Sequence, residues 1–151
     1  MDHRDDLWRY AMAGSMSRNK GARGEREVIA LLQPVVNKVC DAHGKVRLEL
    51  KRNFHQRFQP AQYDLDGLPW MAIEIKRCEN LSGLGSWWAQ VKRATRPGQV
   101  PVLIYRQNHG QWQVRTRLPV RVGSKVVRLT INLAFADWLV WFELKLLEEI
   151  G

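Results

Sequence analysis

The chain has 151 residues, of which 45% are hydrophobic and 26% charged, and this composition is ordinary for a single globular domain. Its 24 Lys and Arg outnumber its 15 Asp and Glu, and the net charge of +9 favours an anionic partner, nucleic acid first, over a generically soluble basic protein. Two cysteines without zinc spacing and no apolar run of membrane-spanning length argue against a disulfide scaffold, a zinc module and a membrane protein. We therefore expect a cytoplasmic protein with free thiols and no signal peptide.

The first part of the chain predicts helices. Residues 1–16 are expected to form a short helix or a loose N-terminal arm, and a longer helix is expected after Ser17 or Asn19, either of which is a suitable cap. This helix carries an apolar stripe over residues 28–39. Pro34 should kink or restart it, and Gly44 should end it.

The middle of the chain predicts three strands. Residues 46–52 alternate apolar and charged side chains, which is typical of a half-buried strand. A polar loop over 53–62 leads to a second short strand at 63–65, and Asp66-Gly67 is a turn signal. The third strand is expected over residues 70–77.

The last part predicts one helix, three strands and a closing helix. A helix over 84–95 has Ser86 as a candidate cap and Pro97-Gly98 as a stop. The run 100–105 should be a central strand, and 112–117 and 126–131 further strands. The closing helix, 133–150, is apolar nearly all round, so we expect one face on the sheet and another at a dimer interface, with a wholly intramolecular helix as the alternative. The sequence thus predicts one α/β domain over 1–151, with a mixed sheet.

Glu74 and Lys76 carry the first chemical signal. Alternate side chains of a strand share a face, so Met71, Ile73 and Ile75 should point into the core and Glu74 and Lys76 together to the other face. The simpler reading is a surface ion pair, worth about 0–1 kcal/mol. The functional reading is a metal-ligand carboxylate beside a lysine that positions water or stabilises developing charge.

Asp64 adds a second carboxylate. A hairpin through residues 67–69 brings it beside the Glu74 strand, where two carboxylates repel unless a cation lies between them. Mg²⁺ often binds through one or two carboxylates, water and substrate phosphate, and a bound metal ion activates water for phosphodiester hydrolysis. Asp66 is the competing carboxylate, and we favour Asp64 because Asp66 fits a turn.

Two further side chains are candidates for the same site. Glu25 shares the helical stripe of residues 28, 29 and 32, so it should face the sheet, whereas Glu27 should face elsewhere. The alternative for Glu25 is a helix-start acid without another role. Gln90, on the helix after the Glu74 strand, is expected either to orient water or phosphate or to be merely solvated.

These residues together resemble a known family. Asp64 followed by Glu74-Ile75-Lys76 resembles the split motif of the PD-(D/E)xK nuclease superfamily. Residues 20–27, Lys-Gly-Ala-Arg-Gly-Glu-Arg-Glu, are similar to the first helix of archaeal-type Holliday junction resolvases and their bacteriophage relatives. The resemblance covers about residues 17–115. Tyr63 stands where the superfamily name has proline, and the chain beyond residue 118 has no counterpart.

The resemblance implies a restriction-endonuclease-like core, a homodimer, and hydrolysis of phosphodiester bonds in four-way DNA junctions in a bacterial or phage-infected cell. It also implies roles for individual residues. Lys76 would be catalytic, and the ligands of Mg²⁺ or Mn²⁺ would be Glu25, Asp64, Glu74 and the Ile75 carbonyl. Arg18, Lys20 and Arg23 would lie near DNA phosphates.

Other basic residues are candidates for lining a DNA groove: Arg52, Arg57, Lys92, Arg93, Arg115 and Arg117. For about half of these six, the alternative is a solvated surface charge without a role in binding.

Three rival functions remain. They are a nuclease for a flap, nick or single strand, a non-catalytic DNA-binding module of the same fold, and an RNA-binding protein, which lacks support from an RNP-like motif.

Overall fold

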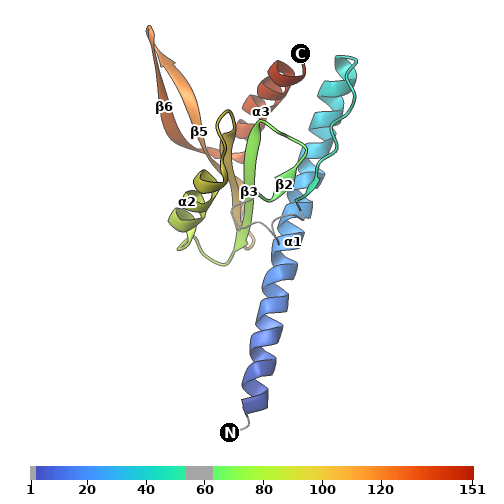
Figure 1. The fold of residues 1–151 in the computed structure, drawn as a ribbon, viewed down its shortest axis with the longest axis vertical. Coiled ribbons are helices and arrows are strands. Elements are labelled where there is room, and N and C mark those ends of the chain that lie inside the picture. The colour runs from blue at the N-terminus through green and yellow to red at the C-terminus, as the bar shows by residue number, and fades with distance from the viewer. Residues whose placement is uncertain (1–2, 54–62) are drawn as a thin grey trace.

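The computed structural model describes the backbone of residues 3–53 and 63–151, and the side chains of residues 21–53 and 63–151. Three helices and six strands lie in these residues (Figure 1). In chain order they are α1 (His3–Ala42), β1 (Lys51–Arg52), β2 (Leu65–Asp66), β3 (Met71–Cys78), α2 (Leu84–Ala94), β4 (Val100–Gln107), β5 (Gln113–Val122), β6 (Lys125–Ala134) and α3 (Phe135–Ile150).

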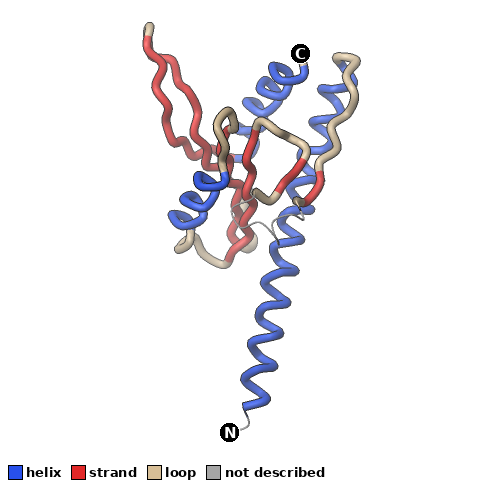
Figure 2. The backbone as a smooth tube through the Cα atoms, in the orientation of Figure 1, coloured by secondary structure: helices blue, strands red, loops and turns tan. Residues whose placement is uncertain are grey.

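The main sheet has four strands in the order β3-β4-β5-β6, so the predicted central strand, β4, is indeed internal. β3 and β4 are parallel and are joined through α2, whereas the β4–β5 and β5–β6 pairs are antiparallel. β1 and β2 form a separate antiparallel pair. The predicted α/β class with a mixed sheet is therefore confirmed (Figure 2).

The helices cover both faces of the sheet. On one face, α1 packs against β3 and α3 packs against β5 and β6, and the two helices also contact each other, in a core that includes Leu32, Ile73, Trp138 and Phe142, all fully buried. On the other face, Trp88 and Val91 of α2 pack against Leu103 and Tyr105 of β4. Met71, Ile73 and Ile75 belong to the first core, as the alternation of β3 predicts.

Helix α1 is longer and more continuous than expected. It begins at His3, so neither Ser17 nor Asn19 starts a helix, and residues before 17 are not a separate arm. A side chain caps the start of a helix only where the preceding chain is not helical, and here the residues before Ser17 are already part of α1. The helix also continues through Pro34 without a restart, because buried Leu32 and Val36 hold it to the sheet on both sides.

The end of α1 and the segment that follows show why the first predicted strand is short. The helix ends at Ala42, and Gly44 has a φ of 63°, the conformation expected of a C-terminal glycine. Of the predicted strand 46–52, only Lys51–Arg52 pairs, and Val46 is 90% exposed. Apolar alternation alone cannot make a strand where no partner strand is present.

Several boundaries in the second half also differ from expectation. The cap position of α2 is Gly83, and Ser86 is no cap, since its hydroxyl donates to the Gly83 carbonyl at 2.9 Å. β5 and β6 are longer than predicted and extend away from the rest of the sheet (Figure 1). Because β6 runs to Ala134, the closing helix begins at Phe135 and not at residue 133. Among the described residues, no helix combines the length and apolarity that crossing a membrane requires.

Candidate active site

Asp64 is held on the free edge of β3, the outer strand of the sheet. Its backbone N–H donates to the Ile73 carbonyl at 2.8 Å, and its Oδ2 accepts a hydrogen bond from the Ile75 N–H at 2.7 Å. The Asn53 N–H donates to the Asp64 carbonyl at 2.8 Å, so the β1 end and the edge of β3 together fix this residue. The carboxylate is buried as a result.

Glu74 is the most deeply buried charged side chain of the described chain, with 1% exposure. Burial, the negative charge of Asp64 and a hydrogen bond with that carboxyl raise the pKa of Glu74 to about 9, while Lys76 acts in the opposite direction. Asp64 and Glu74 thus form a carboxyl pair that binds a proton tightly in the absence of a cation. In the described residues, Oε1 of Glu74 is buried without a hydrogen-bond partner.

Glu25 comes to the same place from α1 and is buried, as its position on the helical stripe predicts. Burial raises its pKa, and the Asp64 charge adds to that effect, while a hydrogen bond from Arg52 and the charge of Lys76 lower it. Its Oε2 is in an ion pair with Nε of Arg52. Glu25 therefore lies beside the carboxyl pair, but it already has a cationic partner.

The Ile75 carbonyl and Lys76 complete the group. In a strand, the N–H and C=O of one residue point to the same edge, and the Ile75 N–H points to Asp64, so the Ile75 carbonyl also faces that edge. Lys76 is half-buried, and its charge acts on both Glu25 and Glu74. Two carboxylates, one carbonyl and one ammonium group are thus gathered at one edge of the sheet.

This donor set fits a hard divalent cation. In the part of the chain that is described, no three His, Cys, Asp or Glu side chains form a cluster that could hold a metal ion. Mg²⁺, however, usually keeps several waters and takes one or two carboxylates plus substrate phosphate. The Asp64–Glu74 pair supplies that minimum, and a cation would satisfy the unpartnered Oε1 of Glu74.

Of the remaining predicted site residues, only Arg52 is brought to this edge by a described contact. Gln90 is exposed on α2, on the side away from the buried Trp88 and Val91. Arg23 is exposed near the start of the described side chains. The side chains of Arg18 and Lys20, and the whole of Arg57, lie outside the described residues. Arg52, a predicted DNA contact, is partly buried and pairs with Glu25.

The neighbouring acids lie apart from the carboxyl pair. The second predicted strand, 63–65, is shifted to Leu65–Asp66, so Asp66 is an exposed strand residue paired with Lys51 and not the predicted turn aspartate, although its Oδ1 accepts a hydrogen bond from the Gly67 N–H at 3.0 Å. Glu27 faces away from the carboxyl pair and binds Arg77 at 2.9 Å and Arg106 at 3.4 Å. Those two ion pairs tie α1 to β3 and β4.

Sequence reasoning missed two residues that shape the site. Asn53 is buried and its side-chain Nδ2 donates to the Tyr63 carbonyl at 3.0 Å, next to Asp64. Arg52 was predicted to contact DNA, whereas in the structure it forms an ion pair with Glu25. Nothing local in the sequence signals either contact, because the partners lie 10 and 27 residues away along the chain.

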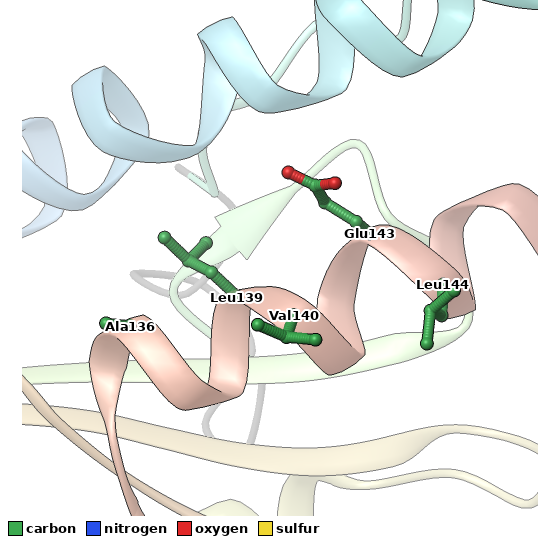
Figure 3. A pocket seen from close by; sticks show the side chains of 5 residues that line it. All are labelled: Ala136, Leu139, Val140, Glu143 and Leu144. Atoms are coloured by element: carbon green, nitrogen blue, oxygen red, sulfur yellow. The ribbon is translucent and has the colours of Figure 1, made fainter.

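A surface hollow of about 380 Å³ lies away from this group, on the outer side of α3 (Figure 3). Its lining comes entirely from that helix: Ala136, Leu139, Val140, Glu143 and Leu144.

Comparison with protein-family models, with curated proteins and with solved structures finds no match for this chain.

Proposed function

We propose that this protein is a Mg²⁺- or Mn²⁺-dependent endodeoxyribonuclease with a restriction-endonuclease-like core, acting on four-way DNA junctions. The observation that carries the proposal is the buried Asp64–Glu74 pair beside Lys76 at the free edge of β3. A buried like-charge pair is costly to a fold unless a cation or proton uses it. The excess of basic residues and the resemblance of the motif to the PD-(D/E)xK superfamily support DNA as the substrate.

Each side chain has a role in this proposal. Asp64, Glu74 and the Ile75 carbonyl would hold the cation, which would supply an activated water and polarise the scissile phosphate. The Lys76 ammonium would orient that water and stabilise the charge that develops on the phosphate oxygens. Glu25 would serve as a further ligand only after Arg52 releases it, for example to a DNA phosphate.

A cleavage assay on defined substrates tests the proposal. The protein is incubated with a mobile-core four-way junction, a flap, a nicked duplex, a plain duplex and a single strand, each with Mg²⁺ or with EDTA. We expect Mg²⁺-dependent cleavage of the junction, and loss of at least about a hundredfold in rate on Glu74→Gln or Lys76→Ala, the order of effect that removing a preorganised charge has in enzymes. Glu79→Gln, at an exposed position just after β3, is the matched control.

The outcomes separate the substrate from the chemistry. Equal cleavage of junction and plain duplex would reject junction selectivity but keep the nuclease. Preferred cleavage of a flap, nick or single strand would replace the junction by that structure. Absence of any metal-dependent product from every substrate would reject the enzyme.

One observation favours a second candidate, a DNA-binding module without catalysis. Arg52 forms an ion pair with Glu25, and in the described residues no three acidic side chains form a cluster that could bind a metal ion without a ligand from the substrate. This candidate predicts DNA binding that is indifferent to Mg²⁺ and to Glu74→Gln, and no product in the cleavage assay.

We extend the proposal to a homodimer. The outer side of α3 exposes Val140 at 64%, Leu144 at 65% and Leu147 at 37%. Exposed apolar patches of this kind mark interaction sites more often than chance placement does. A two-fold dimer would present two cleavage sites, which suits a substrate with two strands to cut.

A further inference from the structure

The outer halves of β5 and β6 form a two-stranded ribbon, residues 117–130, that extends beyond the body of the protein (Figures 1 and 2). Every residue from 121 to 130 is exposed. The sequence has no Asp or Glu between Glu79 and Asp137, so the ribbon carries positive charge only. This segment lies beyond the region that resembles nucleases, and the proposed active site does not use it.

The two faces of the ribbon differ sharply in chemistry. Cross-strand partners share a face, and successive residues alternate between faces. One face carries four arginines and a single exposed valine, through the pairs Arg115–Asn132, Arg117–Thr130, Pro119–Arg128 and Arg121–Val126. The opposite face is mostly apolar, through Leu118–Leu129, Val120–Val127 and Val122–Lys125.

Two of the four arginines donate hydrogen bonds to neutral side chains, which leave their charge unneutralised. Nε of Arg115 donates to Asn132 Oδ1 at 2.8 Å, and Arg117 donates to Thr130 Oγ1 at 3.4 Å. None of the four arginines forms an ion pair within the part of the chain that is described. A ladder of unneutralised arginines at alternate positions is a surface for an anion that repeats along a line.

The arginine face is the sheet face that carries the proposed catalytic residues. Glu74 is in register with Leu103, and Leu103 with Arg115, so these three residues lie in one row across the sheet. Because neighbouring strands are about 4.8 Å apart, the row places Arg115 about 10 Å from Glu74 at the backbone. α2 covers Leu103 in the middle of this row, so the arginine ladder and the carboxyl pair share a sheet face but are separated by that helix.

We propose that the ribbon formed by residues 117–130 is an arm that binds double-stranded DNA, with Arg117, Arg121 and Arg128 on its phosphates and Arg115 at its base. The inference rests on the proposed function, because it takes DNA as the substrate and names a duplex segment flanking the cleaved site as what the arm holds. A two-stranded ribbon fits the major groove of B-DNA, and its arginines reach the phosphates that border the groove.

The composition of the ribbon favours a duplex over two other anionic partners. Binding of single strands relies on aromatic side chains that stack on bases, and residues 113–134 contain no Phe, Trp or Tyr. Segments that lie in a membrane interface carry Trp or Phe beside Leu on their apolar face, whereas residues 113–134 contain neither Trp nor Phe.

The test measures binding without cleavage. Affinity of the whole protein for a short blunt duplex is followed by fluorescence anisotropy in EDTA over a range of salt concentrations. Each phosphate contact contributes about 0.9 to the slope of log K against log salt. Arg121→Gln combined with Arg128→Gln should therefore weaken binding and reduce the magnitude of the slope by about 1.8.

Two controls separate the arginine face from net charge. Lys38→Gln combined with Lys45→Gln removes the same charge from exposed positions at the end of α1, and should leave the slope nearly unchanged. Lys125→Gln removes one charge from the opposite face of the ribbon and should have a smaller effect than Arg121→Gln alone. Thermal melting of each variant confirms that these exposed substitutions leave the fold intact.

The outcomes are distinct from those of the cleavage assay. The proposed DNA-binding arm is overturned if the salt slope of the ribbon variant is unchanged, or if the α1 control loses as much of the slope as the ribbon variant does. It is also overturned by a ribbon variant that loses binding to a single strand or to anionic lipid vesicles while it keeps duplex binding. A wild-type protein that binds duplex through the ribbon but cleaves nothing overturns the proposed function alone.

Discussion

At the scale of single residues, the unusual feature is a carboxyl group whose pKa the fold raises far above its usual range in the absence of a cation. Glu74 is buried between Asp64 and the body of the sheet, and its pKa is raised from 4.5 to about 9. The folded protein therefore binds this proton more tightly than the unfolded chain does. Its contribution to stability is fully present below about pH 4.5 and is lost as the pH rises through about 9.

Glu74→Gln should remove this pH dependence, because the amide stays neutral at every pH. In thermal melts with EDTA, the melting temperature of the variant minus that of the wild type should increase as the pH rises from acid toward pH 9, because only the wild type loses stability with this proton. Glu79→Gln, which is exposed, should follow the wild-type curve. Parallel pH curves for Glu74→Gln and wild type would show that the pair carries no raised pKa.

The same melts test the cation. A divalent ion that binds only the folded state raises stability by mass action. Mg²⁺ or Mn²⁺ should raise the melting temperature of the wild type near neutral pH and leave Glu74→Gln nearly unaffected. An equal shift in both proteins would place the ion elsewhere.

At the scale of elements, Gln33 of α1 replaces a missing strand partner. Its Nε2 donates to the Leu48 carbonyl at 2.9 Å, and its Oε1 accepts from the Leu50 N–H at 2.8 Å. One side-chain amide thus satisfies the backbone of a segment that has strand-like alternation but no neighbouring strand. This segment leads into Arg52 and Asn53, which hold Glu25 and Asp64.

Gln33→Met should destabilise the protein, because it keeps the side-chain volume but leaves a partly buried backbone N–H and carbonyl unpaired. The expected loss is about 1–3 kcal/mol in urea unfolding. Gln90→Met, at an exposed position of α2, is the matched control and should change stability little. Equal effects of the two substitutions would show that the Gln33 bridge is unimportant.

At the scale of the whole molecule, the outer side of α3 belongs to the proposed dimer. Leu144→Asp places a charge at a position with 65% exposure, so it should not harm the monomer fold. We expect sedimentation velocity to show a shift from dimer to monomer. Val122→Asp, at an equally exposed apolar position of the ribbon, should leave the dimer intact. A wild-type monomer, or a dimer that only Val122→Asp disrupts, would reject α3 as the interface.

Much of the framework follows from the sequence by itself. The alternation over residues 71–77 predicts β3 and both of its faces, and the apolar run after Gly98 predicts an internal strand. Helical spacing places Glu25 inward and Glu27 outward, as observed. These features depend on periods of two and 3.6 residues, which are local and therefore visible in one sequence.

Only the tertiary structure decided the remainder, because it depends on partners far apart in the chain. The pairing of Arg52 with Glu25, the Gln33 bridge and the short β1 all involve contacts across 13 residues or more. The arginine ladder likewise needs the β5–β6 register, although Arg115 and Arg117 are recognisable in the sequence as basic candidates. Residue spacing therefore determined which acids face the sheet, and the fold decided that Asp64 and Glu74 meet as a buried pair at its edge.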